Sequence, residues 1–170
     1  MPTAGKSSRA RRAMRAGLRL VPMGAILAST AIIATPAHAE TVSILRSWET
    51  GLCLDSNFAG EVYTLACSVP QNNNHQKWRT NYPFGGPTRF QNVATGRCLA
   101  GTTDDLGFGY AYTTPCGQGF LGWNINGSQS NVWTVGHSGS GSVLESDRSG
   151  HVSIAPIGSG GVYHNWKFGY

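Results

Sequence analysis

The sequence has few charged residues, and beyond residue 39 it lacks any excess of basic ones. The whole chain of 170 residues carries a formal net charge of +5, from 13 Lys and Arg against 8 Asp and Glu. Residues 1–39 hold six of these basic residues and no acidic one, so residues 40–170 carry a net charge of −1. Nucleic-acid binding requires clustered Lys and Arg to neutralise phosphates, so we expect no nucleic-acid partner.

Sequence signatures of catalysis, phosphate binding and metal binding are missing too. There is no Gly-x-x-x-x-Gly-Lys loop, no nucleophile elbow, no metal-hydrolase motif and no Cys-x-x-Cys pair. Asp104 and Asp105 are adjacent carboxylates, but neighbours on an extended segment point in opposite directions, unlike the facing pair of a glycosidase. We therefore expect no enzyme activity, no cofactor and no metal site.

Helical periodicity is absent after residue 40, where Gly, Ser, Asn and Thr interrupt the chain every few residues. Short β-type runs fit better, and Val62–Cys67 and His151–Ala155 alternate as half-buried strands do. The chain is therefore predicted to be all-β. The other predicted strands are Val42–Trp48, Lys77–Thr80, Arg89–Val93, Tyr110–Thr114, Trp123–Asn126, Val132–Val135 and Asn165–Phe168.

Long hydrophobic runs are also scarce. The mainly apolar run Leu20–Ala34 is shorter than the roughly 18 residues that a membrane span needs. It follows a basic stretch and precedes Ala37 and Ala39, the small residues that a signal peptidase reads. We predict that residues 1–39 are a signal peptide, of a length and arginine content typical of a Gram-positive bacterium. Residues 40–170 would then be secreted, with no membrane association after cleavage.

What the sequence does contain is a threefold repeat with a period of 45 residues. Gly51-Leu52-Cys53-Leu54 recurs as Gly96-Arg97-Cys98-Leu99 and as Gly141-Ser142-Val143-Leu144. A tryptophan follows each copy, at Trp78, Trp123 and Trp166. An apolar ring in the same place of every unit indicates a shared core. The repeats run over about residues 40–84, 85–129 and 130–170, in one domain without a linker.

Four cysteines in an exported chain predict disulfides, and four allow three pairings. The repeat favours pairing within each unit, Cys53 with Cys67 and Cys98 with Cys116. The third unit supports this choice, because it has Val143 at the first cysteine position and no cysteine near Ala155, the expected second position.

Three units of about four strands each predict a small barrel closed around a pseudo-threefold axis. A propeller, which also suits this period, usually needs at least about four blades. The stretch Gly136–Ser142 corresponds to the turn at Ala94 and Thr95, and we expect it to form a longer loop within the third unit.

At its first tryptophan the chain reads His75-Gln76-Lys77-Trp78, downstream of Gly51-Leu52-Cys53-Leu54-Asp55. Together with the three in-phase repeats and paired cysteines, this resembles the ricin B-type β-trefoil lectins, whose units carry a Gln-x-Trp signature. The resemblance extends over the whole of residues 40–170. It implies a β-trefoil fold and non-catalytic carbohydrate binding.

The resemblance also implies a sugar site in the first repeat. Asp55 would accept hydrogen bonds from sugar hydroxyls, and Gln76 would brace the site. His75, with Asn74 behind it, stands where the family has a sugar-binding asparagine. Without the resemblance, Asp55 could equally stabilise a turn through an Asx hydrogen bond.

The family's stacking aromatic is replaced here by Leu65. Tyr63 lies two residues earlier, so it points to the same face of its strand and could supply the ring. The second repeat has Ala100 for the aspartate and Leu121 for the glutamine, and the third has Glu145 and His164. We therefore expect one competent site.

The sequence as a whole predicts a secreted, monomeric carbohydrate-binding β-trefoil, for a polysaccharide or a cell-surface glycan. The alternative is a secreted protein-binding β-trefoil, such as a protease inhibitor, in which the sugar sites are eroded. In that case Gly136–Ser142 would be the candidate inhibitory loop.

Overall fold

The computed structural model describes residues 41–80, 87–119, 122–127, 131–159 and 163–169, all within one compact unit, Pro36–Tyr170. The predicted signal peptide, residues 1–39, lies outside the described residues. The described part contains thirteen strands and one 3-10 helix, η1 (Asn74–Gln76). The strands are β1 (Thr41–Ser43), β2 (Leu45–Ser47), β3 (Cys53–Ser56), β4 (Val62–Leu65), β5 (Trp78–Thr80), β6 (Phe90–Asn92), β7 (Cys98–Thr103), β8 (Gly109–Thr114), β9 (Trp123–Gly127), β10 (Trp133–His137), β11 (Ser142–Ser146), β12 (Val152–Pro156) and β13 (Asn165–Phe168).

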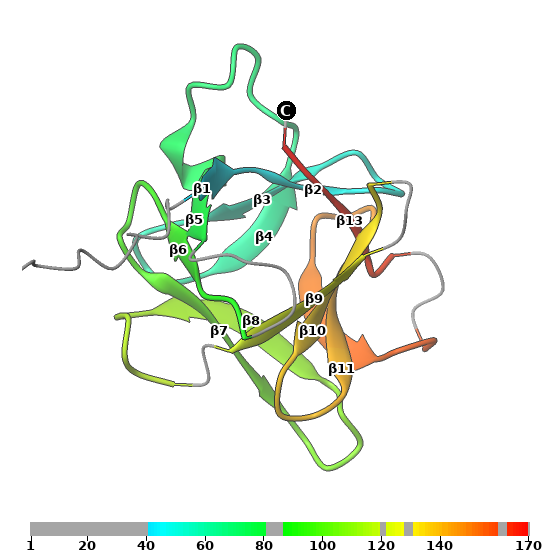
Figure 1. Cartoon of the computed structure of the whole chain (residues 1–170). Helices are drawn as coiled ribbons and strands as arrows, with labels where there is room; N and C mark the ends of the chain where they lie inside the picture. The colour runs from blue at the N-terminus through cyan, green and yellow to red at the C-terminus, as the bar shows by residue number, and fades with distance from the viewer. Residues whose placement is uncertain (1–40, 81–86, 120–121, 128–130, 160–162, 170) are drawn as a thin grey trace, which may run out of the picture. The chain divides into compact units, whose positions relative to one another are not determined.

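Strands β2 to β13 fall into three sets of four, which we call the first, second and third repeats (Figure 1). Within each set the first three strands form an antiparallel meander, as in β2–β3–β4. The fourth strand of each set pairs with the first strand of the next, in β5–β6, β9–β10 and β13–β2. The last of these pairings joins the end of the chain to its beginning, which closes a barrel. The predicted β-trefoil is confirmed.

The strand register follows the 45-residue period. The pairs Arg46–Cys53, Gln91–Cys98 and Gly136–Val143 hold corresponding positions between the first and second strands of the three repeats. The turn before each second strand carries the motif glycine at positive φ, between 67° and 71°. Side chains with a Cβ rarely adopt this conformation, which explains why glycine recurs there. These glycines are Gly51, Gly96 and Gly141.

The three motif tryptophans form the centre of the core, and each is 0% exposed. Each indole Nε1–H donates a hydrogen bond to the carbonyl of the motif leucine in its own repeat. The pairs are Trp78–Leu54 at 3.1 Å, Trp123–Leu99 at 3.0 Å and Trp166–Leu144 at 2.9 Å. The spacing from motif to tryptophan is therefore set by a buried hydrogen bond as well as by packing.

Contacts between the repeats also follow the threefold pattern, with one exception. Two of them are buried hydroxyl pairs, Ser56–Thr113 at 2.9 Å and Thr64–Ser146 at 2.7 Å. The third equivalent pair is Gly101 and Ile154, where a Cβ on the glycine would lie 2.3 Å from Ile154 Cδ1. An apolar contact thus replaces a hydrogen bond at one of three equivalent positions.

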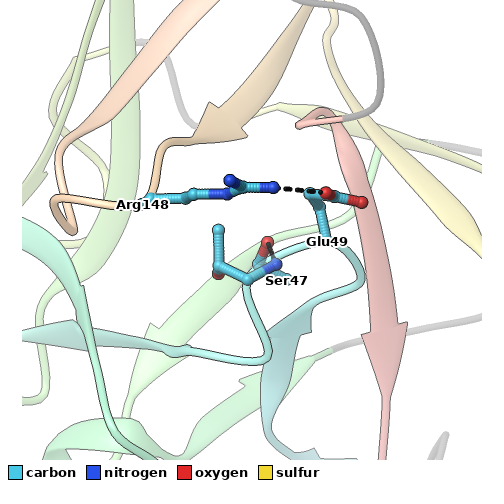
Figure 2. Close-up of polar contacts among 4 residues, drawn as sticks. Ser47, Glu49 and Arg148 are labelled. Carbon is cyan, nitrogen blue, oxygen red and sulfur yellow. Dashed lines mark hydrogen bonds and ion pairs between the residues drawn. The ribbon is translucent and has the colours of Figure 1, made fainter.

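Polar contacts on the surface add to these links. Arg148, in the turn between β11 and β12, forms an ion pair with Glu49 in the turn between β2 and β3, at 3.0 Å (Figure 2). Ser47 Oγ accepts a hydrogen bond from the Thr50 amide in the same turn, at 3.4 Å. The ion pair is largely solvent-exposed, so it adds little to stability.

Two disulfides join Cys53 to Cys67 and Cys98 to Cys116. The predicted pairing is confirmed. The third repeat has Val143 at the first position, and the strand register places Ile157 at the second, two residues beyond the expected Ala155.

Three strands were missed by the sequence analysis, and they are the motif strands β3, β7 and β11. All four residues of β3 are buried, and β7 and β11 begin with buried runs. No period-two alternation marks such strands, because both of their faces are covered. The motif is therefore a turn followed by a strand.

Two further expectations need correction. Val42–Trp48 is not one strand, because β1 pairs with β5 and β2 pairs with β13, and the chain changes partner at Ile44. Gly136–Ser142 is not a longer loop, since Gly136 and His137 end β10 and Ser142 begins β11. The register pair that flanks this turn, Gly136 and Val143, has the same separation in sequence as the corresponding pairs of the other repeats. Within the described ranges, no helix has the length and apolar character needed to cross a membrane.

Candidate functional site

Asp55, in β3, is the acidic residue of the candidate site in the first repeat. It is 2% exposed and stands directly opposite Tyr63 of β4 in the strand register. Its Oδ2 accepts a hydrogen bond from Asn73 Nδ2 at 3.2 Å, and the Tyr63 side chain lies beside it on the same face of the sheet. Burial, followed by the nearby negative charges of Asp55 and Glu61, raises the pKa of Tyr63. The phenol therefore stays protonated beside the carboxylate.

Asn73 is held in place from two sides. As the N-cap of η1, its Oδ1 accepts the His75 amide hydrogen at 3.0 Å. Its own amide donates to Ser68 Oγ at 3.3 Å. The free half of its side-chain amide is thereby directed at Asp55. A carboxylate has several acceptor positions, so the bond from Asn73 leaves capacity for a further hydroxyl.

His75 lies at the edge of the site. Its Nδ1 is 2.7 Å from the carbonyl oxygen of Ser56, and a carbonyl only accepts hydrogen bonds. Nδ1 therefore carries the proton, and Nε2 of the neutral ring remains an acceptor. Phe58, 69% exposed, contacts the histidine edge-on with ring centroids 5.3 Å apart. The half-buried Tyr63 beside Asp55 and the exposed Phe58 beside His75 are aromatic rings of this region.

Gln76 is buried and acts on the neighbouring loop. Its Oε1 accepts the Ser68 amide hydrogen at 2.9 Å, and its Nε2 donates to the carbonyl of Ala66 at 3.1 Å. It thus fixes the segment that follows β4 and carries Cys67. Gln76 therefore braces this segment, whereas its part in a sugar site stays a prediction.

The structure brings together Asp55, Tyr63 and His75, but it does not bring Asn74 to them. Asn74 is exposed, and its Oδ1 accepts a hydrogen bond from Lys77 Nζ at 3.1 Å. The asparagine that contacts Asp55 is Asn73, which the sequence analysis did not single out. Three consecutive asparagines cannot be ranked from sequence unless the helix cap is recognised.

The equivalent positions in the other repeats differ from Asp55. Ala100 stands opposite Tyr112 in the second repeat, and Glu145 stands opposite Ser153 in the third. Glu145 Oε1 accepts a hydrogen bond from Ser153 Oγ at 3.0 Å. Leu121, which replaces the bracing glutamine in the second repeat, lies outside the described residues. The carboxylate, amide and two rings thus occur together in the first repeat only, among the described residues.

Comparison with known proteins gives a clear result for structure only. The sequence matches no family model and no curated protein. Among solved structures, the designed threefold-symmetric protein ThreeFoil is similar, with a TM-score of 0.64 and 19% identity, covering 76% of this chain and 98% of that one.

Two natural proteins show the same likeness. A ricin B-like lectin from Macrolepiota procera, solved in complex with lactose, has a TM-score of 0.62 and 12% identity, over 76% of this chain and 94% of that one. An exo-β-1,3-galactanase from Clostridium thermocellum has a TM-score of 0.64 and 17% identity, over 75% of this chain but only 30% of the enzyme. At these identities the likeness shows the fold, and the chain is a β-trefoil of the kind found in ricin B-like lectins.

Proposed function

We propose that this protein is a secreted, non-catalytic carbohydrate-binding β-trefoil whose first repeat holds the sugar. Residues 1–39 would direct export, and residues 40–170 would act as a monomer. The two disulfides are consistent with an oxidising compartment. The target class is a polysaccharide or a cell-surface glycan.

The observation that carries the proposal is the difference between Asp55 and Ala100. Both residues occupy the same position opposite a tyrosine, and the strands around them pair in the same register. The second repeat thus builds this strand pair without a carboxylate. The fold therefore does not require a carboxylate at this position, and its presence in the first repeat alone of these two favours a binding role over a structural one.

The surroundings of Asp55 have the chemistry that a sugar requires. A sugar presents hydroxyls around an apolar face, so its site needs acceptors together with an aromatic surface. Asp55 and His75 Nε2 supply acceptors, Asn73 orients the carboxylate, and Tyr63 and Phe58 supply rings. Two solved structures of similar fold have bound sugars, lactose in one and the asialo-GM1 saccharide in the other, which supports the same class of ligand.

The proposal can be tested on a glycan array, followed by titration calorimetry with the best ligand. Asp55→Asn keeps the shape of the side chain but removes the charge and one acceptor. We expect it to weaken binding on the order of tenfold, the usual range for a hydrogen bond to a charged group. Asn74→Ala is the matched control, because it removes a neighbouring side chain that points to Lys77, and it should bind as the parent does.

Binding that is unchanged by Asp55→Asn would contradict the first-repeat site. No binding to any glycan would contradict carbohydrate recognition and favour the alternative of a protein partner. The inhibitory-loop version of that alternative gains nothing from the turn after His137, which is no longer than its counterparts in the other repeats.

A further inference from the structure

A groove lies on another part of the molecule, between β2, β13 and the segment that follows β4. Its volume is about 590 Å³, within the usual range for small-ligand sites. None of the residues that form the Asp55 site lines it. The residues that matter here are Ile44, Arg46, Leu52, Gln71, Lys167 and Phe168.

Two cations lie side by side in the lining of this groove. Arg46 of β2 and Lys167 of β13 are direct partners in the strand register, so their side chains emerge on the same face. Like charges in this arrangement destabilise a sheet. Arg46 Nε donates to the carbonyl of Gly51 at 3.0 Å, and Lys167 Nζ lies 4.0 Å from the centre of the Trp48 ring.

No carboxylate among the described residues forms an ion pair with either cation. The nearest acidic residue in the sequence, Glu49, is paired with Arg148 instead (Figure 2). The positive charges of the groove are therefore left uncompensated within the described part of the chain.

The threefold symmetry shows that the fold does not require this pair of charges. The two equivalent register pairs are Arg79–Gln91 and Asn124–Gly136, with one positive charge and none. Gln91 Nε2 donates to the carbonyl of Gly96 at 2.9 Å, the same contact that Arg46 makes to Gly51. A neutral amide can therefore brace this turn, and the charge on Arg46 needs another explanation.

The remaining lining adds an acceptor and apolar walls. Gln71 Oε1 is buried without a hydrogen-bond partner among the described residues. A buried acceptor without a partner is costly, and a donor on a ligand would relieve that cost. Ile44, Leu52 and Phe168 supply apolar surface next to the cations.

We propose that this groove binds an acidic sugar, in which a carboxylate or a sulfate contacts Arg46 and Lys167. A hydroxyl of the same sugar would donate to Gln71, and the apolar walls would contact the face of the ring. The anion site is independent of the proposed function, whereas the choice of a sugar as its carrier rests on it. The groove would act as a second site that selects negatively charged sugars, whereas the Asp55 site would not select for negative charge.

The test is titration calorimetry of the purified protein with hexuronate oligosaccharides, sulfated oligosaccharides and a neutral oligosaccharide of the same length. Inorganic sulfate serves as a bare anion. We expect the acidic ligands to bind more tightly than the neutral one, with an affinity that falls as salt rises. The comparison of carboxylated with sulfated ligands identifies the preferred anion.

The variant for this test is Arg46→Gln/Lys167→Gln, since the glutamine at position 46 can keep the contact to Gly51 as Gln91 does to Gly96. We expect a loss on the order of tenfold or more in affinity for acidic ligands. Arg79→Gln is the matched control, because it removes one cation at the equivalent position of β5, and it should bind as the parent does.

Three results would overturn the proposal. The double variant could bind acidic sugars as the parent does, the neutral oligosaccharide could bind as tightly as the acidic ones, or Arg79→Gln could lose as much affinity as the double variant. Inorganic sulfate that binds as tightly as the sulfated sugar would reject the sugar as carrier. Asp55→Asn separates the two sites, since it should leave acidic-sugar binding in the groove unchanged.

Discussion

The first and second repeats of this β-trefoil share their scaffold and differ in what they present to a ligand. Both have a glycine turn at positive φ, a disulfide, and a buried tryptophan bonded to the motif leucine. Opposite equivalent tyrosines, however, the first repeat has Asp55 and the second has Ala100. Features needed to close the barrel recur in each unit, whereas features that could hold a ligand vary between units.

The cation pair of the groove shows the same variation at the seams between repeats, by which we mean the strand pairs β5–β6, β9–β10 and β13–β2. Lys167 and Arg46 are joined by a strand pairing that all three seams possess, yet only this seam has two positive charges. Equivalent positions of the three repeats can therefore be compared within one molecule. A residue type that occurs in only one repeat is not required by the backbone arrangement that all three share.

The largest effect should follow from removing a motif tryptophan. Trp123→Ala deletes a fully buried ring and its hydrogen bond to Leu99, so we expect a loss of about 3–5 kcal/mol in the free energy of unfolding. Denaturant titration measures this loss. Trp78→Ala and Trp166→Ala should cost similar amounts, and a much smaller cost for one of them would break the equivalence of the repeats.

The disulfides should come next. Cys98→Val/Cys116→Ser gives the second repeat the valine that the third repeat carries at this position, Val143. We expect a loss of about 2–4 kcal/mol with the fold retained, because the third repeat folds without a disulfide. Circular dichroism and denaturant titration check both points. Cys53→Val/Cys67→Ser removes a disulfide whose loop is of similar length, 14 residues against 18, and should cost a similar amount.

The Gly101–Ile154 contact, which replaces a hydroxyl pair, predicts a smaller loss of stability that a second substitution should partly restore. Gly101→Ser introduces a Cβ close to Ile154 Cδ1 and should destabilise the protein by about 1–3 kcal/mol through overpacking. Adding Ile154→Thr recreates the Ser–Thr pair of the other two contacts and should recover part of the loss. If the double variant is less stable than Gly101→Ser, the three contacts are not interchangeable.

The smallest effect concerns pH. Burial lowers the pKa of His137 below its ordinary value of 6.5, so the folded state binds a proton less readily than the unfolded state. Stability should therefore fall as pH drops from 6.5 toward the lowered pKa and should rise again with pH through that window. His137→Asn places there the residue found at the equivalent Asn92, and it should flatten this dependence. Denaturant titrations of the parent and of His137→Asn from pH 5 to pH 7.5 measure this dependence. If stability varies with pH equally in both proteins, His137 does not contribute to it.

How far the sequence predicted this site depended on the kind of interaction. Asp55 and Gln76 were predicted from the resemblance to a family motif that is read along the chain, relative to Cys53 and Trp78. Asn73 could not be chosen over Asn74, since the choice depends on which of them caps η1. Phe58 was missed because its place beside His75 depends on two loops that are distant in sequence.

The groove could not be predicted at all. Arg46 and Lys167 lie at opposite ends of the described chain, and only the β13–β2 pairing makes them neighbours. Nothing in the local sequence of either strand indicates that pairing, because β2 and β13 meet only when the barrel closes.

The sequence by itself determined the three repeats, the all-β class, the disulfide pairing and the tryptophan core. These depend on spacing and on residue types that recur, and both are legible along the chain. The tertiary structure decided which side chains converge: the motif strands with both faces buried, Asn73 at Asp55, and the two cations of one seam. Convergence depends on strand register and barrel closure, which are properties of the packed chain and not of any one segment.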